Sequence, residues 1–308
     1  MSGAEIFLEF LLFPGLLFTA VAGLLTSWVD RKVTAMVQMR VGPPFLQPFY
    51  DVRKLFIKET CVPEGGAIGM FLVAPLIGFA GVALASLILW RTLLNSEVTF
   101  VGDLIVLIYL LMMPALAVVL GSFASRNPLA SIGGSREIKL MIAYELPLVL
   151  AVLVPVIQAD SIRLGDLVSA PAPAGSLSGI LALLVCIACM QAKLTLVPFD
   201  MPEAETELSG GVLIEYSGPP LAMYKLTRAM MLFTMPVFLV VIFAGGAVAN
   251  GGLSAKILGV LLGLAVVVVF IVVRNTTPRV RTDQAVRFFW GPVNSAALLA
   301  AAIAWMGW

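Results

Sequence analysis

The chain has 308 residues, of which 60% are hydrophobic and only 12% are charged. A soluble domain has about a quarter of its residues charged, so this composition indicates an all-α, polytopic membrane protein in a lipid bilayer. The net charge of +1 gives no reason to expect a nucleic-acid partner. The absence of histidine excludes histidine-held metals, histidine-ligated haem and serine–histidine catalysis.

Eight apolar runs each have close to the ~20 residues that a helix needs to cross a bilayer. They are residues 6–29, 68–90, 104–124, 138–158, 178–197, 221–243, 255–273 and 287–307. The first run is too long for a signal-peptide core and has no basic residue before it, so we interpret it as a retained transmembrane helix. We predict one integral membrane domain over residues 1–308, with short and amphipathic helices in its cytoplasmic loops.

The basic residues are distributed unevenly among the loops. Counted together with the span ends that border them, the loops after spans one, three, five and seven contain 16 of the 19 basic residues. The other three, Arg91, Arg163 and Lys256, fall after spans two, four and six. Because basic loops stay in the cytoplasm, we predict a multi-pass protein of the inner (cytoplasmic) membrane with both termini outside.

The first cytoplasmic loop contains a rigid turn at Gly42-Pro43-Pro44, followed by apolar side chains at helical spacing. Those side chains are Phe45, Phe49, Val52 and Phe56. This pattern predicts an amphipathic helix in the membrane interface, either as a lipid anchor or as a docking ledge for a cytoplasmic partner. The charged residues expected to pair or dock here are Arg31, Lys32, Arg40, Asp51 and Lys54.

Glu145 follows Tyr144 inside the apolar fourth span. A carboxylate in such a place is costly and usually faces a polar cavity or a partner. One hypothesis is that both residues belong to a proton pathway. The alternative is a structural ion pair of Glu145 with Arg136, Lys139 or a residue of another helix.

The loop after the fifth span is the most acidic part of the chain. It contains Asp200, Glu203, Glu205, Glu207 and Glu215. Asp200 and Glu203 have capping-box spacing, which predicts a short new helix on which Glu203 and Glu207 would repel each other. So much negative charge beside a membrane has to be paired, solvated or protonated, which indicates ion handling or docking.

The last cytoplasmic loop is predicted to lie on the same side as the acidic loop, and its arginines to neutralise Glu203 to Glu215. Its charged residues include Arg279, Arg281, Asp283 and Arg287. The nearby Cys186 and Cys189 have CxxC spacing inside an apolar helix, whereas a metal cluster needs about four ligands. We therefore expect no cofactor, metal or catalytic site in this chain, and any redox centre in another subunit.

The acidic loop resembles a known family. PFDMPEAETEL, residues 198–208, with EYSG after it, is similar to the cytoplasmic loop of respiratory complex I subunit 1, the membrane subunit that receives the hydrophilic arm. Other matching residues are Gly133, Arg136, Tyr144 and Glu145 in span four, Asp51, Lys54, Leu55, Lys58 and Glu59 in the first loop, and Arg274, Pro278, Arg279, Arg281, Asp283, Gln284 and Trp290 in the last. The resemblance covers nearly the whole chain and implies eight spans in the same orientation.

Two departures from the family pattern indicate a branch. Quinone-reducing members typically read E-x-N-R-x-P-F-D before the acidic loop, where this chain has Lys193, Thr195 and Leu196. Their first loop usually reads GPNRVGP, whereas this chain has the GPP turn. Both changes fall in regions that shape the family's quinone chamber, and the GPP form is similar to energy-converting, membrane-bound NiFe hydrogenases.

The resemblance implies a membrane subunit that docks the hydrogenase large and small subunits and couples their reaction to proton or sodium movement. It also implies iron–sulfur clusters and a NiFe site in those partners, and antiporter-like membrane subunits beside this chain. The alternatives are a quinone-site subunit of a complex I-type enzyme, a secondary transporter and a purely structural anchor. No pair of repeats supports the transporter.

The predicted orientation places Cys61 in the cytoplasm. A membrane-impermeant thiol reagent should label Cys61 in inverted vesicles and leave it unlabelled in right-side-out vesicles. Cys186 and Cys189, inside an apolar helix, should stay unlabelled in both. Labelling of Cys61 in right-side-out vesicles would reverse the orientation.

Overall fold

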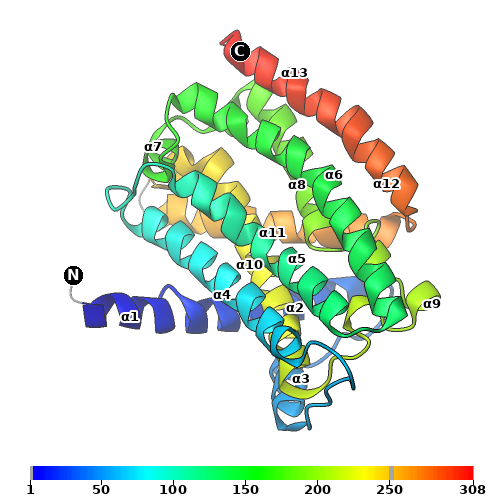
Figure 1. Ribbon diagram of the computed structural model, residues 1–308. Coiled ribbons are helices and arrows are strands. Elements are labelled where there is room, and N and C mark those ends of the chain that lie inside the picture. The colour runs from blue at the N-terminus through cyan, green and yellow to red at the C-terminus, as the bar shows by residue number, and fades with distance from the viewer. Residues whose placement is uncertain (1–2, 250–252, 308) are drawn as a thin grey trace.

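The computed structural model describes residues 3–249 and 253–307, and the regular structure of this part is entirely helical (Figure 1). The all-α membrane fold is thus confirmed. The long helices are α1 Gly3–Leu11 with α2 Leu16–Val37, α4 Ile68–Leu94, α5 Asp103–Ala124, α6 Pro128–Ala159, α8 Leu177–Lys193, α10 Gly218–Ala249, α11 Leu253–Thr276, and α12 Thr282–Phe288 with α13 Asn294–Trp305. A π-helical turn, η4 Phe289–Val293, joins the last two.

Seven helical segments among the described residues are long and apolar enough to cross a bilayer, against eight expected spans. The eighth expected span corresponds to α8, which has 17 residues and is therefore roughly 26 Å long. The predicted end of this span at residue 197 is wrong, since the helix ends at Lys193. Pro198 disfavours a helical conformation at residue 197, and Thr195 has a positive φ of 49°.

Short helices connect the spans. The amphipathic helix predicted in the first loop is present as α3 Gln47–Ile57, which packs against α2 and α10. Its apolar face is divided, because Phe49 and Val52 pack against the core while Phe56 is exposed. On the opposite end of the molecule, α7 Leu164–Ser169 and η1 Pro173–Gly175 lie between α6 and α8.

The long helices form two packed groups. In the first, α10 packs against α2, α4 and α11, and α4 packs along α5. In the second, α6 packs against α8 and α13, and the contact of α5 with α6 joins the groups (Figure 1). Helix α10 is the most buried of the candidate spans, and α11 is the most exposed. The exposed apolar face of α11 is therefore suited to lipid or to another membrane subunit.

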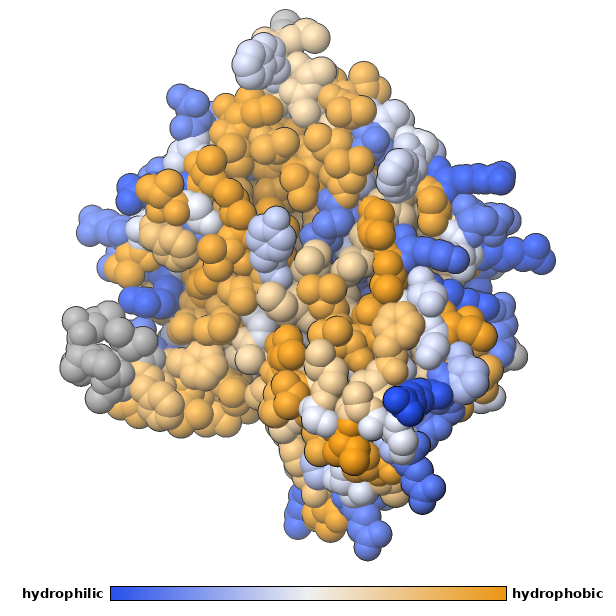
Figure 2. Space-filling model, viewed as in Figure 1, coloured by the Kyte–Doolittle hydropathy of each residue, from blue (hydrophilic) through white to orange (hydrophobic). Residues whose placement is uncertain are grey.

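Hydropathy divides the surface into an apolar centre and polar edges. Figure 2 shows orange side chains across the middle of the face and blue side chains gathered mainly at its right and lower edges. Backbone hydrogen bonds bring the basic loops together, from Ala67 N to the Ala124 oxygen at 3.1 Å and from Val280 N to the Pro198 oxygen at 3.1 Å. The loops that the charge pattern assigns to one side thus lie at one end of the helical bundle.

Candidate functional site

The acidic loop lies at the end of the molecule where the basic loops gather. It folds into three short turns, η2 Met201–Glu203, α9 Glu205–Leu208 and η3 Gly211–Leu213. Gly211 has a φ of +58°, and a Cβ there would lie 2.7 Å from Glu203 Cα. Gly133 on α6 similarly leaves room for the backbone of this loop, because its Cβ would lie 2.9 Å from the Pro202 oxygen. Glycine at both positions allows the loop to pack directly on α6.

Three carboxylates of the loop each pair with an arginine from a different part of the chain. The pairs are Asp200 with Arg279 at 2.8 Å, Glu207 with Arg136 at 2.6 Å, and Glu203 with Arg228. Arg136 belongs to α6, Arg228 to α10, and Arg279 to the loop after α11. Arg228 also donates to the carbonyl and hydroxyl oxygens of Thr195, both at 3.2 Å. The last loop was expected to neutralise Glu203 to Glu215, but its Arg279 pairs with Asp200 instead, and Glu203 and Glu207 pair with arginines of α10 and α6.

These pairs overturn two expectations for the loop. The Asp200 side chain makes no capping bond, because its carboxylate binds Arg279 instead. Glu203 and Glu207 fall in separate turns and each has its own arginine, so the predicted repulsion along one helix does not arise. In both cases pairing a partly buried charge outweighs the local helix pattern.

The remaining two carboxylates of the acidic loop are Glu215 and Glu205. Glu215 accepts a hydrogen bond of 2.6 Å from the Asn127 side chain, at the start of α6. Glu205 begins α9, and its side chain lies outside the part that the structure describes.

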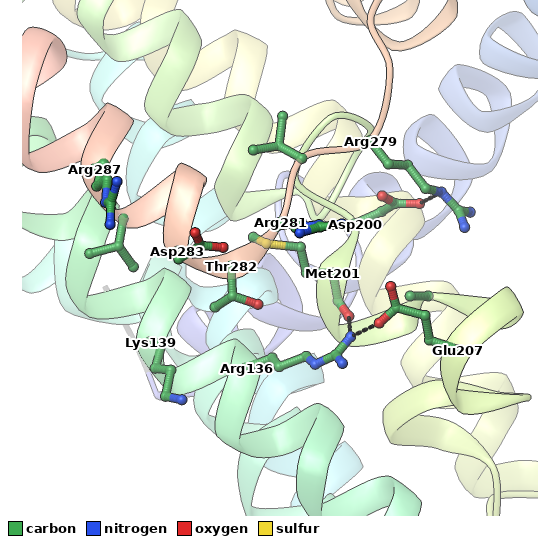
Figure 3. A pocket seen from close by; sticks show the side chains of 13 residues that line it. Arg136, Lys139, Asp200, Met201, Glu207, Arg279, Arg281, Thr282, Asp283 and Arg287 are labelled. Carbon is green, nitrogen blue, oxygen red and sulfur yellow. Dashed lines mark hydrogen bonds and ion pairs between the residues drawn. The ribbon is translucent and has the colours of Figure 1, made fainter.

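A pocket of about 830 Å³ opens between α6, the acidic loop and the last loop (Figure 3). Most of the residues that line it are charged, namely Arg136, Lys139, Asp200, Glu207, Arg279, Arg281, Asp283 and Arg287. Five are basic and three acidic, so the pocket carries a net charge of +2 when all are ionised. We call it the charged pocket. Small-molecule sites are mostly apolar, so this lining suits a polar or acidic segment of a partner better than a quinone ring.

Glu145 is bound by a lysine from another helix. Lys193 Nζ, at the end of α8, lies 3.0 and 3.3 Å from the two carboxylate oxygens of Glu145. The lysine side chain is 1% exposed and that of Glu145 is 21% exposed. Lys193 Nζ also lies 5.5 Å from the ring centroid of Tyr144, whose buried hydroxyl has no hydrogen-bond partner among the described residues. Of the alternatives left open, the partner from another helix is the one found.

The first loop contributes a separate ion pair between α2 and α3. Arg31 donates to Asp51 at 2.7 Å, and Gln47 donates to it at 3.0 Å. Partial burial acts to raise the pKa of Asp51, but the hydrogen bonds from Arg31 and Gln47 and the nearby Lys225 outweigh it, so the pKa lies below its usual range. The other predicted docking residues do not join this pair; Arg40 and Lys54 are exposed and Lys32 is half-buried beside Gly42.

Three charged residues of the site were not predicted as site residues: Glu137, Lys193 and Arg228. Lys193 was noticeable only as a departure from a family pattern. Arg228 lies about three turns inside the apolar helix α10, where an arginine requires a partner, and that signal was available. Glu137 stands between Arg136 and Lys139, and its burial, with 2% exposure, follows only from the packing of α6.

Comparison with known proteins gives the family. A model of the NADH dehydrogenase family matches residues 9–305. The chain belongs to this family. Among its relatives, an NADH-quinone oxidoreductase subunit of Geobacillus thermodenitrificans is 34% identical over 89% of this chain and 87% of its own length. The corresponding protein of Brevibacillus brevis is 32% identical over 94% and 90%.

A solved structure is similar over the whole fold. It is a chain of the membrane-bound sulfane sulfur reductase, an archaeal respiratory membrane complex, with a TM-score of 0.86 and 27% identity. The match covers 97% of this chain and 99% of that one. The resemblance to complex I subunit 1 is therefore confirmed, and the chain is a complex I-type membrane subunit of an oxidoreductase complex.

Lys193 stands where the resemblance to quinone-reducing members implies a glutamate. Quinone-reducing members resembled by this chain typically have glutamate there, whereas Lys193 supplies the buried counter-ion of Glu145. A second carboxylate in that place would leave Glu145 facing a like charge. The substitution therefore changes the electrostatics of the membrane interior as well as the sequence motif.

The effects of substituting Lys193 and Glu145 on the free energy of unfolding should not be additive. We expect Glu145→Leu to destabilise the assembled complex by about 3–5 kcal/mol, because it leaves a buried ammonium without its partner. Lys193→Met should cost less, since Glu145 retains some solvent. The double variant should be more stable than Glu145→Leu alone, with a coupling energy of roughly 1–3 kcal/mol. Thermal unfolding of the four purified complexes measures this cycle, and strictly additive effects would contradict the pair.

Proposed function

We propose that this chain is the membrane subunit of an energy-converting NiFe hydrogenase, in which it anchors the hydrophilic electron-transfer arm and couples its redox reaction to proton or sodium translocation. The large and small hydrogenase subunits dock at the end formed by the acidic and basic loops. Antiporter-like membrane subunits lie beside the chain in the bilayer. The iron–sulfur clusters and the NiFe site belong to the docked partners, and this chain takes part in no redox chemistry itself.

The observation that carries the proposal is the charged pocket. It gathers Arg136, Asp200, Glu207, Arg279, Arg281 and Asp283 from segments far apart in the sequence. Lys139, Arg281, Asp283 and Arg287 line it around the ion pairs that hold the loop. Charged rims of this kind orient a partner and accelerate its association. The Arg31–Asp51 pair and exposed Lys54 support α3 as a second contact at the same end.

The coupling role rests on Tyr144, Glu145 and the acidic loop. Glu145 is a carboxylate within a membrane-spanning helix, and such residues commonly mark ion pathways. The loop acids Asp200, Glu203 and Glu207 lie at the surface where a redox partner would dock. An electron arriving there acts electrostatically on these ion pairs. Glu145 then passes charge in the plane of the membrane toward the antiporter-like subunits.

The second candidate is a quinone-site subunit of a complex I-type NADH:quinone oxidoreductase. The names of relatives with 32–35% identity favour it. The sulfane sulfur reductase, similar over 97% of this chain, supports a third kind of redox partner on the same membrane subunit. Against the quinone stand the charged lining of the pocket and Lys193, Thr195 and Leu196 in place of the family's quinone-chamber motif.

The subunits that purify with this chain test the choice. We expect a nickel-containing large subunit, hydrogen evolution from a reduced artificial electron donor, and no quinone-dependent turnover. Stoichiometric bound quinone, or inhibition by low concentrations of quinone-site blockers, would favour the second candidate. Ion transport by the chain alone in liposomes would favour a secondary transporter.

Glu145→Gln tests the coupling. The variant keeps the shape and a hydrogen-bond acceptor for Lys193 but cannot exchange a proton. We expect an assembled complex with slowed turnover or with ion uptake per electron lowered roughly tenfold or more. Glu205→Gln and Glu207→Gln should act similarly if the acidic loop is the cytoplasmic entrance.

The measurement compares hydrogen evolution and ion uptake in vesicles with equal amounts of assembled complex. The matched control is Glu97→Gln, an exposed glutamate at the opposite end. Normal uptake per electron in Glu145→Gln, together with loss of the arm in the loop variants, would leave the chain as a structural anchor.

A further inference from the structure

The end of the molecule opposite the acidic loop contains a short helix that the site as described does not use. Helix α7, Leu164–Ser169, and the turn η1, Pro173–Gly175, follow α6 and lead into α8. Figure 1 shows α7 at the end of the bundle away from α9. A connection between two helices normally runs over the surface, because its backbone needs water or other hydrogen-bond partners. This connection is folded into the core instead.

The apolar side of α7 is enclosed by the long helices. Leu164 and Val168 have no exposed surface, and Leu167 is 2% exposed. All three belong to the main hydrophobic core, together with Leu104 of α5 and Phe243 of α10. Helix α7 also contacts α4 and α6, while η1 contacts α8. The segment therefore bridges the two packed groups of helices at this end.

The backbone of this segment lies directly against its neighbours. A Cβ built at Gly165 of α7 would lie 2.1 Å from the Ser96 oxygen, in the loop between α4 and α5. A Cβ built at Gly246 of α10 would lie 1.9 Å from the Ala170 oxygen, just after α7. A space that cannot hold a methyl group cannot hold a water molecule, so no water passes at either contact.

A buried carboxylate fastens α7 to the bundle. Asp103, the first residue of α5, is 1% exposed. Its Oδ1 atom accepts hydrogen bonds of 2.8 Å from the backbone N–H groups of Leu104 and Leu164. Because Leu164 begins α7, one carboxylate oxygen holds the starts of two helices. An apolar side chain in place of Asp103 would leave the buried Leu164 N–H group without this acceptor.

The two ends of the molecule thus differ in their access to water. The charged pocket and a cavity of about 370 Å³, lined by Glu137, Thr195 and Arg228 among others, both border the acidic loop. At the opposite end, the buried residues of α7 fill the junction between the helix groups. An ion needs water or polar partners along its path, and these buried side chains are apolar.

We propose that α7, positioned by Asp103, is a permanent plug that closes this chain to ions at the end opposite the acidic loop. An ion that enters beside the acidic loop then has no exit through the opposite end. The plug stays closed throughout the reaction cycle. This role goes beyond the proposed function, because it concerns the resting permeability of the chain and does not depend on the identity of the redox partner.

Passive ion leak through the resting complex tests the plug. The assembled complex is reconstituted into liposomes without an electron donor, a potassium diffusion potential is applied, and a pH-sensitive dye inside the vesicles records proton entry. Asp103→Ala should raise the leak over wild type roughly tenfold or more, because losing a hydrogen bond to a charged group releases the start of α7. Asp103→Asn keeps an acceptor oxygen and should stay close to wild type.

Two further variants complete this measurement. Gly246→Val pushes the Ala170 backbone away without changing Asp103, so it should raise the leak in the same way. The matched control is Asp166→Ala, which removes an exposed carboxylate from α7 itself and should leave the leak unchanged. A wild-type leak in assembled Asp103→Ala and Gly246→Val complexes would overturn the proposal.

A disulfide between α7 and α10 separates the loss of a plug from general damage to the fold. A Cβ built at Gly245 of α10 would lie 3.5 Å from the Cβ atom of Val168. Disulfides have about 3.5–4.5 Å between these atoms. In the Asp103→Ala complex, Val168→Cys with Gly245→Cys should restore the wild-type leak when oxidised and show the raised leak when reduced. Cys61→Ser removes the exposed thiol from this background.

The same cysteine pair, with Asp103 intact, tests whether the plug is permanent. Redox-driven ion uptake should be equal in the oxidised and reduced forms, because α7 does not move during the cycle. Loss of uptake on oxidation would show that α7 opens as a gate and would overturn the permanent plug. If the wild-type complex takes up no ions, the proposed function fails, while the leak of Asp103→Ala and its reversal by the disulfide still decide the role of α7.

Discussion

The pairing of charge at the edge of a low-dielectric interior is the constraint on which this end of the molecule depends. Each of three loop carboxylates meets an arginine, and the three arginines come from α6, α10 and the last loop. Asp200 is the most buried of the three acids, with 12% of its side chain exposed, so the loss of Arg279 would leave the most poorly solvated of these charges without its partner. The acidic loop is therefore held in place by helices distant in the sequence, and its conformation is sensitive to any change in their charge.

In the function proposed above, the same constraint makes the loop a suitable sensor of redox events in a docked partner. A unit charge about 10 Å away acts with roughly 1.7 kcal/mol at an effective dielectric constant of 20. That energy corresponds to slightly more than one pKa unit of a carboxylate. An electron arriving in a docked partner can therefore shift the balance of pairs such as Asp200–Arg279, whose second carboxylate oxygen, Oδ1, has no hydrogen-bond partner among the described residues. Balanced charge near neutrality is what makes so small a perturbation effective.

Hydropathy and charge counting were sufficient for the fold, since both depend on long segments. They predicted the positions of the long helices, the interfacial helix α3 and the gathering of basic loops at one end. They failed where a single contact determines the local structure. Helix α8 ends at Lys193, because the backbone before Pro198 disfavours a helix. The Asp200 carboxylate pairs with Arg279 and therefore does not cap a helix. The partner of Glu145 was Lys193, 48 residues away in sequence, and no local pattern could have specified that contact.

Helix α6 forms part of the wall between two polar spaces of the described residues, the charged pocket and an inner cavity of about 370 Å³ between α5, α6, α10 and the segment after α8. Arg136 lines the charged pocket, while the adjacent Glu137 lines the inner cavity. Neighbouring residues of a helix point about 100° apart, so one turn of α6 forms part of the wall between the two spaces. The acidic loop completes that wall, with Asp200 and Glu207 on the outer side and Glu203 on the inner side. A partner that binds in the charged pocket and competes for Arg136 or Glu207 would therefore act on the same wall that positions Glu137 and Glu203, so in the proposed function the docking surface and the acids of the coupling path share one structural element.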